Sequence, residues 1–316
     1  MFPDMILRQI TLCLCALILA GCGQEPAPPK QTTTKTTTTQ KSIVIGLIPE
    51  QNIFKQLERY EPLKGYLSGK IGMIVTFKIQ PTYEDIIVKF TSGEIDGAFL
   101  GSFIYTLAHE KLGVEVLARP VSPDNTSTYH GLIFVRKDSG INSVQGMKGK
   151  RFAFVGKATY AGYLFPIEYF RHHGISNPKE YLKESYFAGT QSDVILDVLN
   201  KKADIGAAKN TIFNKLAKED PRIKKNLVVL ERSPDVPENA IALRKDIDGS
   251  LRRSLLNAFL NMHLDPEGRE VLEKFGAQRF IETKDEEYDI VRSYADHLHL
   301  NLETYEMNYK QEGGRK

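Results

Sequence analysis

Four loops of this chain combine small residues with hydroxyl or amide side chains, and each follows a short apolar run. They are Pro49–Asn52, Leu100–Phe103, Gly156–Gly162 and Gly189–Ser192. Hydroxyls and the free N–H groups at a helix N-terminus donate hydrogen bonds without carrying a formal charge, and the helix dipole favours an anion there. The four loops therefore predict a cradle of neutral donors for a small oxyanion.

The residues expected to line this cradle lie in or beside these loops. We expect ligand contacts from Glu50, Tyr83, Ser102, Phe103, Tyr105, Thr159, Tyr160, Ala161 and Gln191, with Asp204 and Asn210 as further candidates. Other roles remain open for several of them. Ser102, Thr159 and Ser192 are also suited to cap helices. Tyr83 and Tyr105 are suited to half-buried surface positions, and Asp204, like Asp96, to the entry of a strand.

Residue patterns typical of catalysis are missing from the sequence. It has no Ser-His-Asp order, no phosphate-binding Gly-rich loop with a lysine and no metal-binding motif. All three cysteines, Cys13, Cys15 and Cys22, lie near the N-terminus, so the body has no thiol nucleophile, disulfide or thiolate metal site. We therefore expect no enzymatic activity, no cofactor and no metal. The formal net charge of +3 gives no electrostatic argument for nucleic acid.

The first residues resemble an export signal. Arg8 precedes an apolar run from Ile10 to Leu19, which is too short for a mature membrane-spanning helix. The run ends in Leu19-Ala20-Gly21-Cys22, which resembles the bacterial lipobox, whose cysteine is acylated. The alternative is an ordinary signal peptide that happens to end near a cysteine.

Segment 1–21 is therefore predicted to be a lipoprotein signal peptide and Cys22 the lipidated residue. Residues 22–41 are rich in Pro and Thr, a composition typical of a disordered spacer. In an organism with two membranes, Gly23 rather than Asp after the cysteine resembles lipoproteins passed to the outer one. The protein is expected to face the periplasm from a bacterial membrane.

Short apolar runs alternate with helical patterns along the rest of the chain, which predicts an α/β fold with parallel pairing. A strand at 42–48 is followed by Phe54, Leu57, Tyr60, Leu63 and Leu67 at helical spacing. Further strands are expected at 74–79 and 95–100, and helices at 83–91 and 103–109.

The alternation restarts at a strand over 132–136. Strands are expected again at 150–155, 186–187, 205–208 and 227–230, and helices at 161–172, 193–199 and 212–217. A strand at 239–244 precedes a helical C-terminal region, and residues 309–316 are expected to be frayed. The order predicts two lobes with mixed sheets flanked by helices: 42–133 as the first part of lobe 1, 134–232 as lobe 2, and 233–316 as the return to lobe 1. The crossings are expected near 130–136 and 231–238.

Several segments resemble the phosphate/phosphite/phosphonate-binding protein family of ABC transporters. They are Tyr83–Ile87, Gly93–Tyr105, Arg136–Ile141, Gly149–Phe154, Gly162–Pro166 and Ala203–Ala207. The resemblance implies a periplasmic-binding-protein fold that closes on its ligand. Phosphonate-binding members usually have Asp-Pro and then Ser-Thr-Ser-Gly in the third loop, where this chain has Gly156-Lys157 and then Thr159-Tyr160-Ala161-Gly162. Gln191 stands where those relatives often carry a histidine.

The sequence and the resemblance together lead to one interpretation. We expect a monomeric, lipid-anchored solute-binding protein that delivers a small phosphonate-, phosphite- or phosphate-like oxyanion to an ABC permease. The alternative is a ligand-sensing protein that presents its closed form to a signalling receptor. An enzyme with a similar two-lobed fold is a third class, which the missing acid–base groups disfavour.

Overall fold

A computed structural model describes residues 41–307, which belong to one compact unit beginning at Gln40. The expected signal peptide, the expected lipidation site Cys22, the expected spacer up to residue 40 and the expected frayed end lie outside the described residues. Within the described part, no helix combines the length and apolar character needed to cross a membrane.

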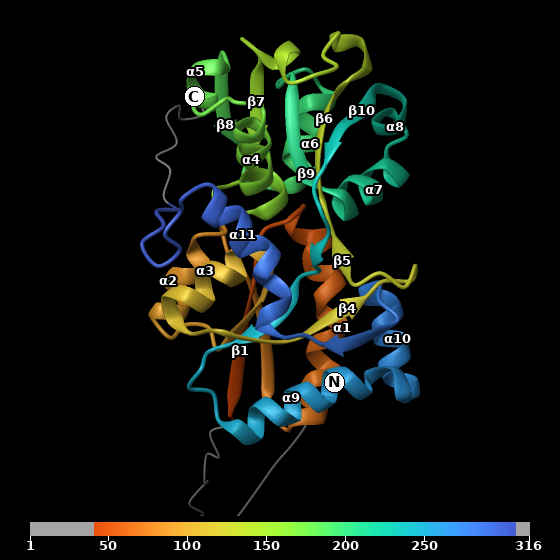
Figure 1. Cartoon of the computed structure of the whole chain (residues 1–316). Coiled ribbons are helices and arrows are strands. Elements are labelled where there is room, and N and C mark those ends of the chain that lie inside the picture. The colour runs from red at the N-terminus through yellow and green to blue at the C-terminus, as the bar shows by residue number, and fades with distance from the viewer. Residues whose placement is uncertain (1–40, 308–316) are drawn as a thin grey trace, which may run out of the picture. The chain divides into compact units, whose positions relative to one another are not determined.

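The first lobe is built on a six-stranded mixed sheet (Figure 1). Its order is β13-β4-β12-β3-β1-β2. β1 pairs in parallel with β2 and β3, whereas β12 runs antiparallel to β3 and β4, and β13 antiparallel to β4. The strands are β1 (Ser42–Leu47), β2 (Ile74–Ile79), β3 (Gly97–Leu100), β4 (Glu115–Val121), β12 (Ala240–Leu243) and β13 (Arg279–Glu282).

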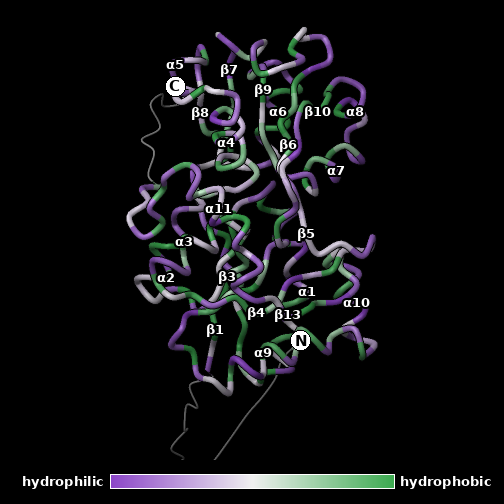
Figure 2. Tube along the Cα trace, in the orientation of Figure 1, coloured by the Kyte–Doolittle hydropathy of each residue, from purple (hydrophilic) through white to green (hydrophobic). Residues whose placement is uncertain are grey.

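Helices cover both faces of this sheet because its strands are apolar on both sides (Figure 2). Phe99 of β3 packs in the cluster under α1 (Ile53–Ile71), α9 (Gly249–Asn261) and α10 (Pro266–Phe275). Its neighbours Ala98 and Leu100 belong to the cluster under α2 (Asp85–Thr91), α3 (Ser102–Leu112) and α11 (Asp289–His297). Successive side chains of a strand point to opposite faces, so one strand contributes to both clusters.

The second lobe is built on a five-stranded sheet of order β10-β6-β9-β7-β8. β7 pairs in parallel with β8 and β9, and β6 runs antiparallel to β9 and β10. The strands are β6 (Gly131–Arg136), β7 (Arg151–Phe154), β8 (Glu184–Phe187), β9 (Ile205–Lys209) and β10 (Leu227–Arg232). The helices are α4 (Phe165–His172), α5 (Pro178–Tyr181), α6 (Gln191–Leu199), α7 (Asn210–Glu219) and α8 (Arg222–Asn226). Short turns of helix are η1 (Lys137–Ser139), η2 (Gln145–Met147), η3 (Tyr160–Leu164), η4 (Met262–Leu264) and η5 (Asp285–Tyr288).

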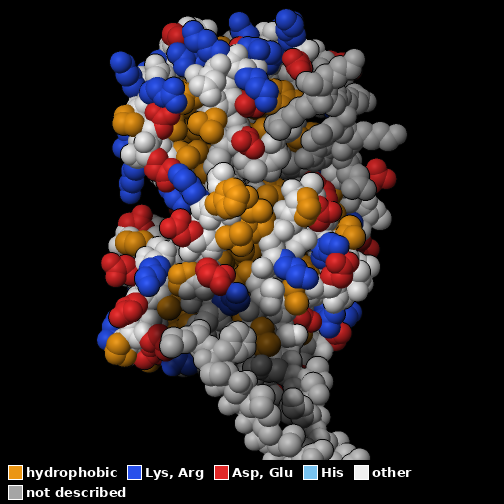
Figure 3. Space-filling view, turned by 180° about the vertical axis from the view of Figure 1, so that it is seen from behind, with side chains coloured by type: hydrophobic (Ala, Val, Ile, Leu, Met, Phe, Trp, Pro, Cys, Tyr) orange, Lys and Arg blue, Asp and Glu red, His pale blue; other side chains and the backbone are white. Residues whose placement is uncertain are grey.

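Two short strands join the lobes. The chain leaves the first lobe through β5 (Thr128–Tyr129) and returns through β11 (Val236–Pro237), and these two strands pair antiparallel. Helix α11 also contacts both lobes: it packs on α3, and its Tyr294 ring lies 5.5 Å from that of Tyr160. On the back of the molecule, apolar side chains gather where the lobes meet, and Lys and Arg side chains gather over the second lobe (Figure 3).

In each lobe, an aspartate just before one strand makes the same pair of hydrogen bonds with the neighbouring strand. Asp96 before β3 accepts a hydrogen bond from the N–H of Val44, and its own N–H donates to the Val44 carbonyl. Asp204 before β9 makes the same pair of bonds with Arg151. Both aspartates thus extend a strand pairing by one residue.

The first turn of α1 differs from the predicted apolar stripe. Phe54 and Leu57 are 77% and 36% exposed, whereas Gln56 is 2% exposed. Gln56 donates to the carbonyl of Ile48 and accepts from the N–H of Glu50. Buried backbone groups need partners, so Gln56 faces inward and the two apolar side chains face solvent. The helix predicted from these residues is present, but its buried apolar side chains begin at Tyr60.

Both sheets are mixed, as predicted, because β12, β13, β6 and β10 have antiparallel neighbours beside the parallel pairs. One further prediction on the elements needs correction. The C-terminal region is not purely helical, since β13 runs along the edge of the first sheet beside β4, and neither strand was predicted.

Candidate functional site

A small cavity lies between the lobes, at the carboxyl ends of β1, β3, β7 and β9. This edge is where parallel α/β sheets bind ligands. The cavity holds about 10 Å³, room for about one water molecule. Predicted residues that line it are Glu50, Tyr83, Phe103, Thr159, Tyr160, Ala161 and Gln191.

Two helix N-termini from opposite lobes reach this cavity. Phe103 and Ile104 lie in the first turn of α3, and Tyr160 and Ala161 in the first turn of η3, which continues directly into α4. The N–H groups of a first turn have no acceptor within their own helix, and the dipole makes this end positive. The cavity is therefore suited to bind an anion through uncharged donors.

Gln191 links the lobes beside these N-termini. Its Oε1 accepts from the backbone N–H of Lys209 at 2.9 Å, and its Nε2 donates to the hydroxyl of Tyr83 at 3.4 Å. Burial raises the pKa of Tyr83, so its hydroxyl stays protonated. Because Tyr83 precedes α2 in the first lobe, this contact joins the two walls of the cavity.

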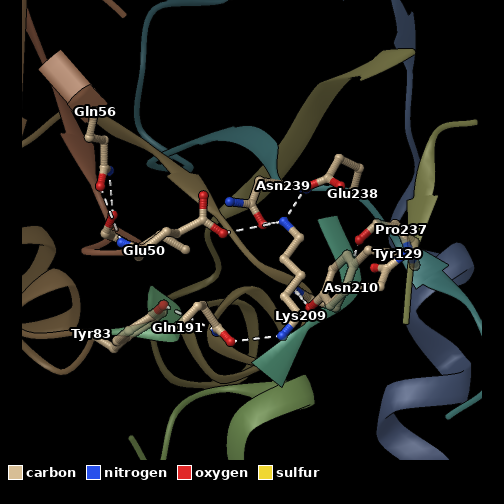
Figure 4. Close-up of polar contacts among 12 residues, drawn as sticks. Glu50, Gln56, Tyr83, Tyr129, Gln191, Lys209, Asn210, Pro237, Glu238 and Asn239 are labelled. Atoms are coloured by element: carbon tan, nitrogen blue, oxygen red, sulfur yellow. Dashed lines mark hydrogen bonds and ion pairs between the residues drawn. The ribbon is translucent and has the colours of Figure 1, made fainter. Parts of the chain in front are cut away.

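Lys209 is the centre of a buried charged cluster (Figure 4). Its Nζ lies 3.3 Å from Oε1 of Glu50 and 2.9 Å from Oδ1 of Asn239, and it also pairs with Glu238. The same Nζ lies 4.3 Å from the centre of the Tyr129 ring. Lys209 is 3% exposed. An ammonium group thus has three oxygens and an aromatic face around it, which accounts for its three N–H donors.

Lys209 and Glu238 favour each other's charged form because they are paired. Burial by itself would lower the pKa of Lys209, but Glu238 and Glu50 outweigh it and raise that pKa. Burial would likewise raise the pKa of Glu238, but the Lys209 ammonium holds it below its usual value. Two carboxylates and one ammonium leave the cluster with one formal negative charge at neutral pH.

The turn that carries Thr159 and Ala161 depends on Gly162. The Gly162 carbonyl accepts from the N–H of Val155. A Cβ at Gly162 would lie 2.3 Å from Cγ2 of Val155, so only glycine allows this close approach. Thr159 donates its hydroxyl proton to the carbonyl of Gly156 at 2.7 Å, and its side chain makes no capping bond to η3. Its hydroxyl therefore stabilises the loop rather than the helix N-terminus.

Four predicted residues lie away from the cavity. Ser102 donates to the Pro237 carbonyl in the crossing, and Asn210 accepts from the N–H of His130. Tyr105 donates to Asp285 on the far side of α3 and packs on the Tyr288 ring. Asp204 precedes β9, at the opposite end of that strand from the cavity, and pairs with Arg151.

Ser102, Thr159 and Ser192 were also suited to cap helices, but their side chains make no capping hydrogen bond. Thr190 caps α6 instead, by accepting from the N–H of Asp193. The Ser192 hydroxyl is buried and has no hydrogen-bond partner in the structure.

Sequence reasoning missed Lys209, Tyr129, Asn239 and Glu238, the first three of which line the cavity. The signal for Lys209 was present, since it directly follows the predicted strand 205–208 at its carboxyl end. No comparable signal marked its partners, which lie in the crossing segments. Among the described residues, no group of His, Cys, Asp or Glu is arranged to hold a metal ion.

Comparison with known proteins places this geometry in a family. A family model described as ABC transporter, phosphonate, periplasmic substrate-binding protein matches residues 45–288. The chain belongs to this family. The resemblance predicted from the sequence is confirmed.

Relatives from this family are similar to this protein over most of its chain. The phosphonates-binding periplasmic protein of Escherichia coli (strain K12) is 26% identical over 261 residues, which are 81% of this chain and 76% of that protein. The crystal structure of a binding protein component of an ABC phosphonate transporter from Pseudomonas aeruginosa has a TM-score of 0.76 at 22% identity, covering 82% of this chain and 87% of that one.

A second solved structure has the same fold. PhnD1 of Prochlorococcus marinus (MIT 9301), in complex with methylphosphonate, has a TM-score of 0.73 at 20% identity and covers 82% of this chain and 98% of that one. The predicted two-lobed periplasmic-binding-protein fold is therefore confirmed.

Proposed function

We propose that this protein is a lipid-anchored, non-enzymatic carrier that binds a small phosphonate-like oxyanion between its lobes and delivers it to an ABC permease. The observation that carries the proposal is the meeting of two helix N-termini, those of α3 and η3, at one buried cavity. Each lobe contributes one of them. An anion would therefore gain its full set of donors only when the lobes are together.

The charge of the cavity favours an anion of low charge. Phe103, Ile104, Tyr160 and Ala161 line the cavity beside free backbone donors, whereas Glu50, Lys209 and Asn239 line it as part of the Lys209 cluster, which holds one net negative charge. A dianion would face that carboxylate excess at close range. A monoanion places less charge against it.

Relatives support the ligand class. The Escherichia coli relative is a phosphonates-binding protein, and the Prochlorococcus marinus structure holds methylphosphonate. The third loop and Gln191 differ from the usual phosphonate pattern, but the loop still presents a helix N-terminus. Backbone donors are independent of side-chain identity, which is how the site can keep its ligand class with other side chains.

Anchoring is proposed from the sequence alone. Cys22 follows a lipobox-like motif, and residues 22–41 have the composition of a flexible spacer. A spacer of this length would hold the body roughly 20–25 Å from the membrane. Gly23 favours the outer membrane.

Calorimetric titration with methylphosphonate, phosphite and phosphate tests the ligand class, beside native mass spectrometry of the protein purified from the periplasm. We expect saturable binding of at least one of these three oxyanions. Binding of none of the three, or a co-purified ligand without an acidic oxyanion, contradicts the proposal.

A pair of variants locates the site. Ala161→Asp puts a carboxylate at the N-terminus of η3, where like charges cost several kcal/mol, and is expected to abolish binding. Ala161→Asn has nearly the same shape and no charge, so it controls for crowding at this buried position. Affinities of both variants equal to that of the wild type would place the anion elsewhere.

A further inference from the structure

The Lys209 cluster has the form of a binding position for a primary ammonium group. Two carboxylates, Glu50 and Glu238, and the amide oxygen of Asn239 surround one point, and the Tyr129 ring covers it. All four residues are less than 10% exposed. Oxygen acceptors together with an aromatic face recognise a cation.

In this protein the ammonium group of Lys209 occupies this position. Lys209 reaches it from the end of β9 in the second lobe, whereas Glu50 follows β1 in the first, and Glu238 and Asn239 lie between β11 and β12. The three acceptors account for all three N–H protons of Nζ. Lys209 therefore has no proton left to donate to an oxyanion in the cavity.

Occupancy points the same way as charge. The Lys209 side chain itself fills the space beside the three acceptors. A ligand with an ammonium arm would need both the volume of the Lys209 side chain and its carboxylate partners.

We propose that Lys209 acts as a built-in ammonium that fills this position and so restricts the ligand to small oxyanions without an ammonium group. Lys209 thereby excludes aminoalkylphosphonates. The oxyanion itself is bound by the neutral donors of α3 and η3. The inference rests on the proposed function for the identity of the oxyanion, but the ammonium position is tested separately.

The first test replaces the side chain by a free amine. Lys209→Ala removes the atoms from Cγ to Nζ, which n-propylammonium matches. We expect n-propylammonium chloride to raise the melting temperature of Lys209→Ala and to leave that of the wild type unchanged. Tetramethylammonium chloride at the same concentration controls for ionic strength, because it has no N–H donor. Equal responses to the two salts, or an equal response of the wild type, overturn the proposal.

Three further variants keep the test informative. Lys209→Met fills the space without a charge and should show no amine response. If Lys209→Ala does not fold, Lys209→Ala/Glu238→Gln leaves only one buried carboxylate and should still respond to n-propylammonium. Lys215→Ala is the matched control: Lys215 also bridges the lobes, through Gln51, but lies outside the cavity. An amine response in Lys215→Ala would contradict the assignment.

The second test measures specificity. We expect the wild type to bind methylphosphonate at least about tenfold more tightly than 3-aminopropylphosphonate, a difference of about 1.4 kcal/mol. Lys209→Ala should reverse this order. Wild-type affinities that are equal, or an unchanged order in the variant, overturn the proposal.

The two tests separate this inference from the function on which it rests. An amine response confined to Lys209→Ala, with no phosphonate bound by any form, supports the ammonium position and refutes the proposed ligand class. Methylphosphonate binding without any amine response does the reverse.

Discussion

The backbone N–H of Ser192 donates to the backbone carbonyl of Glu50 at 3.3 Å, so the two lobes meet main chain to main chain. Ser192 lies in the first turn of α6 and Glu50 just after β1. The side chains on either side, those of Gln191 and Glu50, both reach Lys209. The residues that join the lobes therefore also line the cavity. Substitutions of these residues should affect the stability of the fold as well as ligand binding.

Gln191→Met tests this link. The variant leaves the buried N–H of Lys209 without its side-chain acceptor, so we expect the free energy of unfolding to fall by about 1–3 kcal/mol. Tyr83→Phe removes only the 3.4 Å contact with Nε2 and should cost about 0.5–1.5 kcal/mol. Urea denaturation measures both. A larger loss from Tyr83→Phe would mean that the hydroxyl of Tyr83 has a more important partner than Gln191.

Gly162→Ala should disrupt the third loop. The new Cβ would lie 2.3 Å from Val155 and 2.9 Å from the Thr159 hydroxyl, so overpacking should destabilise the protein by about 1–3 kcal/mol. Oxyanion affinity should fall as well, because Thr159 and Ala161 move with the turn. Gly156→Ala is the control in the same loop, since its Cβ would meet nothing closer than 3.8 Å. Thermal unfolding of the two variants gives the comparison, and equal melting temperatures would refute the packing argument.

Acid should weaken the contact between Arg119 and Glu287. Burial would raise the pKa of Glu287, but hydrogen bonds from Arg119, the Lys284 N–H and Thr283 lower it to about 2. A carboxyl with a depressed pKa stabilises the fold fully above its unfolded value of 4.5, and this contribution disappears as the pH falls from 4.5 towards 2.

The corresponding variant is Glu287→Gln. It should be less stable than the wild type above pH 4.5, and the two melting curves should converge as the pH approaches 2. Glu286→Gln, an exposed neighbour in the same turn, is the control. A constant gap between wild type and Glu287→Gln across this pH range would show that Glu287 contributes no ionised-state stability.

Lipid attachment should depend on Cys22. Cys22→Ala should abolish incorporation of a labelled fatty acid, because the other two cysteines lie within the expected signal peptide. Two acyl chains give stable membrane attachment where one is marginal, so the variant should also leave the membrane fraction. Cys15→Ala is the matched control and should be labelled normally. Labelling that persists in Cys22→Ala contradicts the lipoprotein assignment.

Much of the candidate site could be predicted because it follows from local order. Runs such as 42–48, 150–155 and 205–208 identify strands by their apolar character, and the residues after each strand lie at the sheet edge. Glu50, Thr159 and Gln191 were found in this way and do line the cavity. Tyr105 was also selected from this loop region. However, its position along α3 places its side chain on the opposite face of that helix, where it donates a hydrogen bond to Asp285.

The sequence by itself determined the alternation of strands and helices, the positions of the loops and the family, because these depend on residue patterns over short spans. Only the tertiary structure decided that Lys209 meets Glu50, 159 residues away, and Glu238, 29 residues away. That pairing depends on the crossings β5 and β11 and on how closely the lobes approach. A buried ammonium needs acceptors, but no local pattern specifies which distant carboxylates supply them.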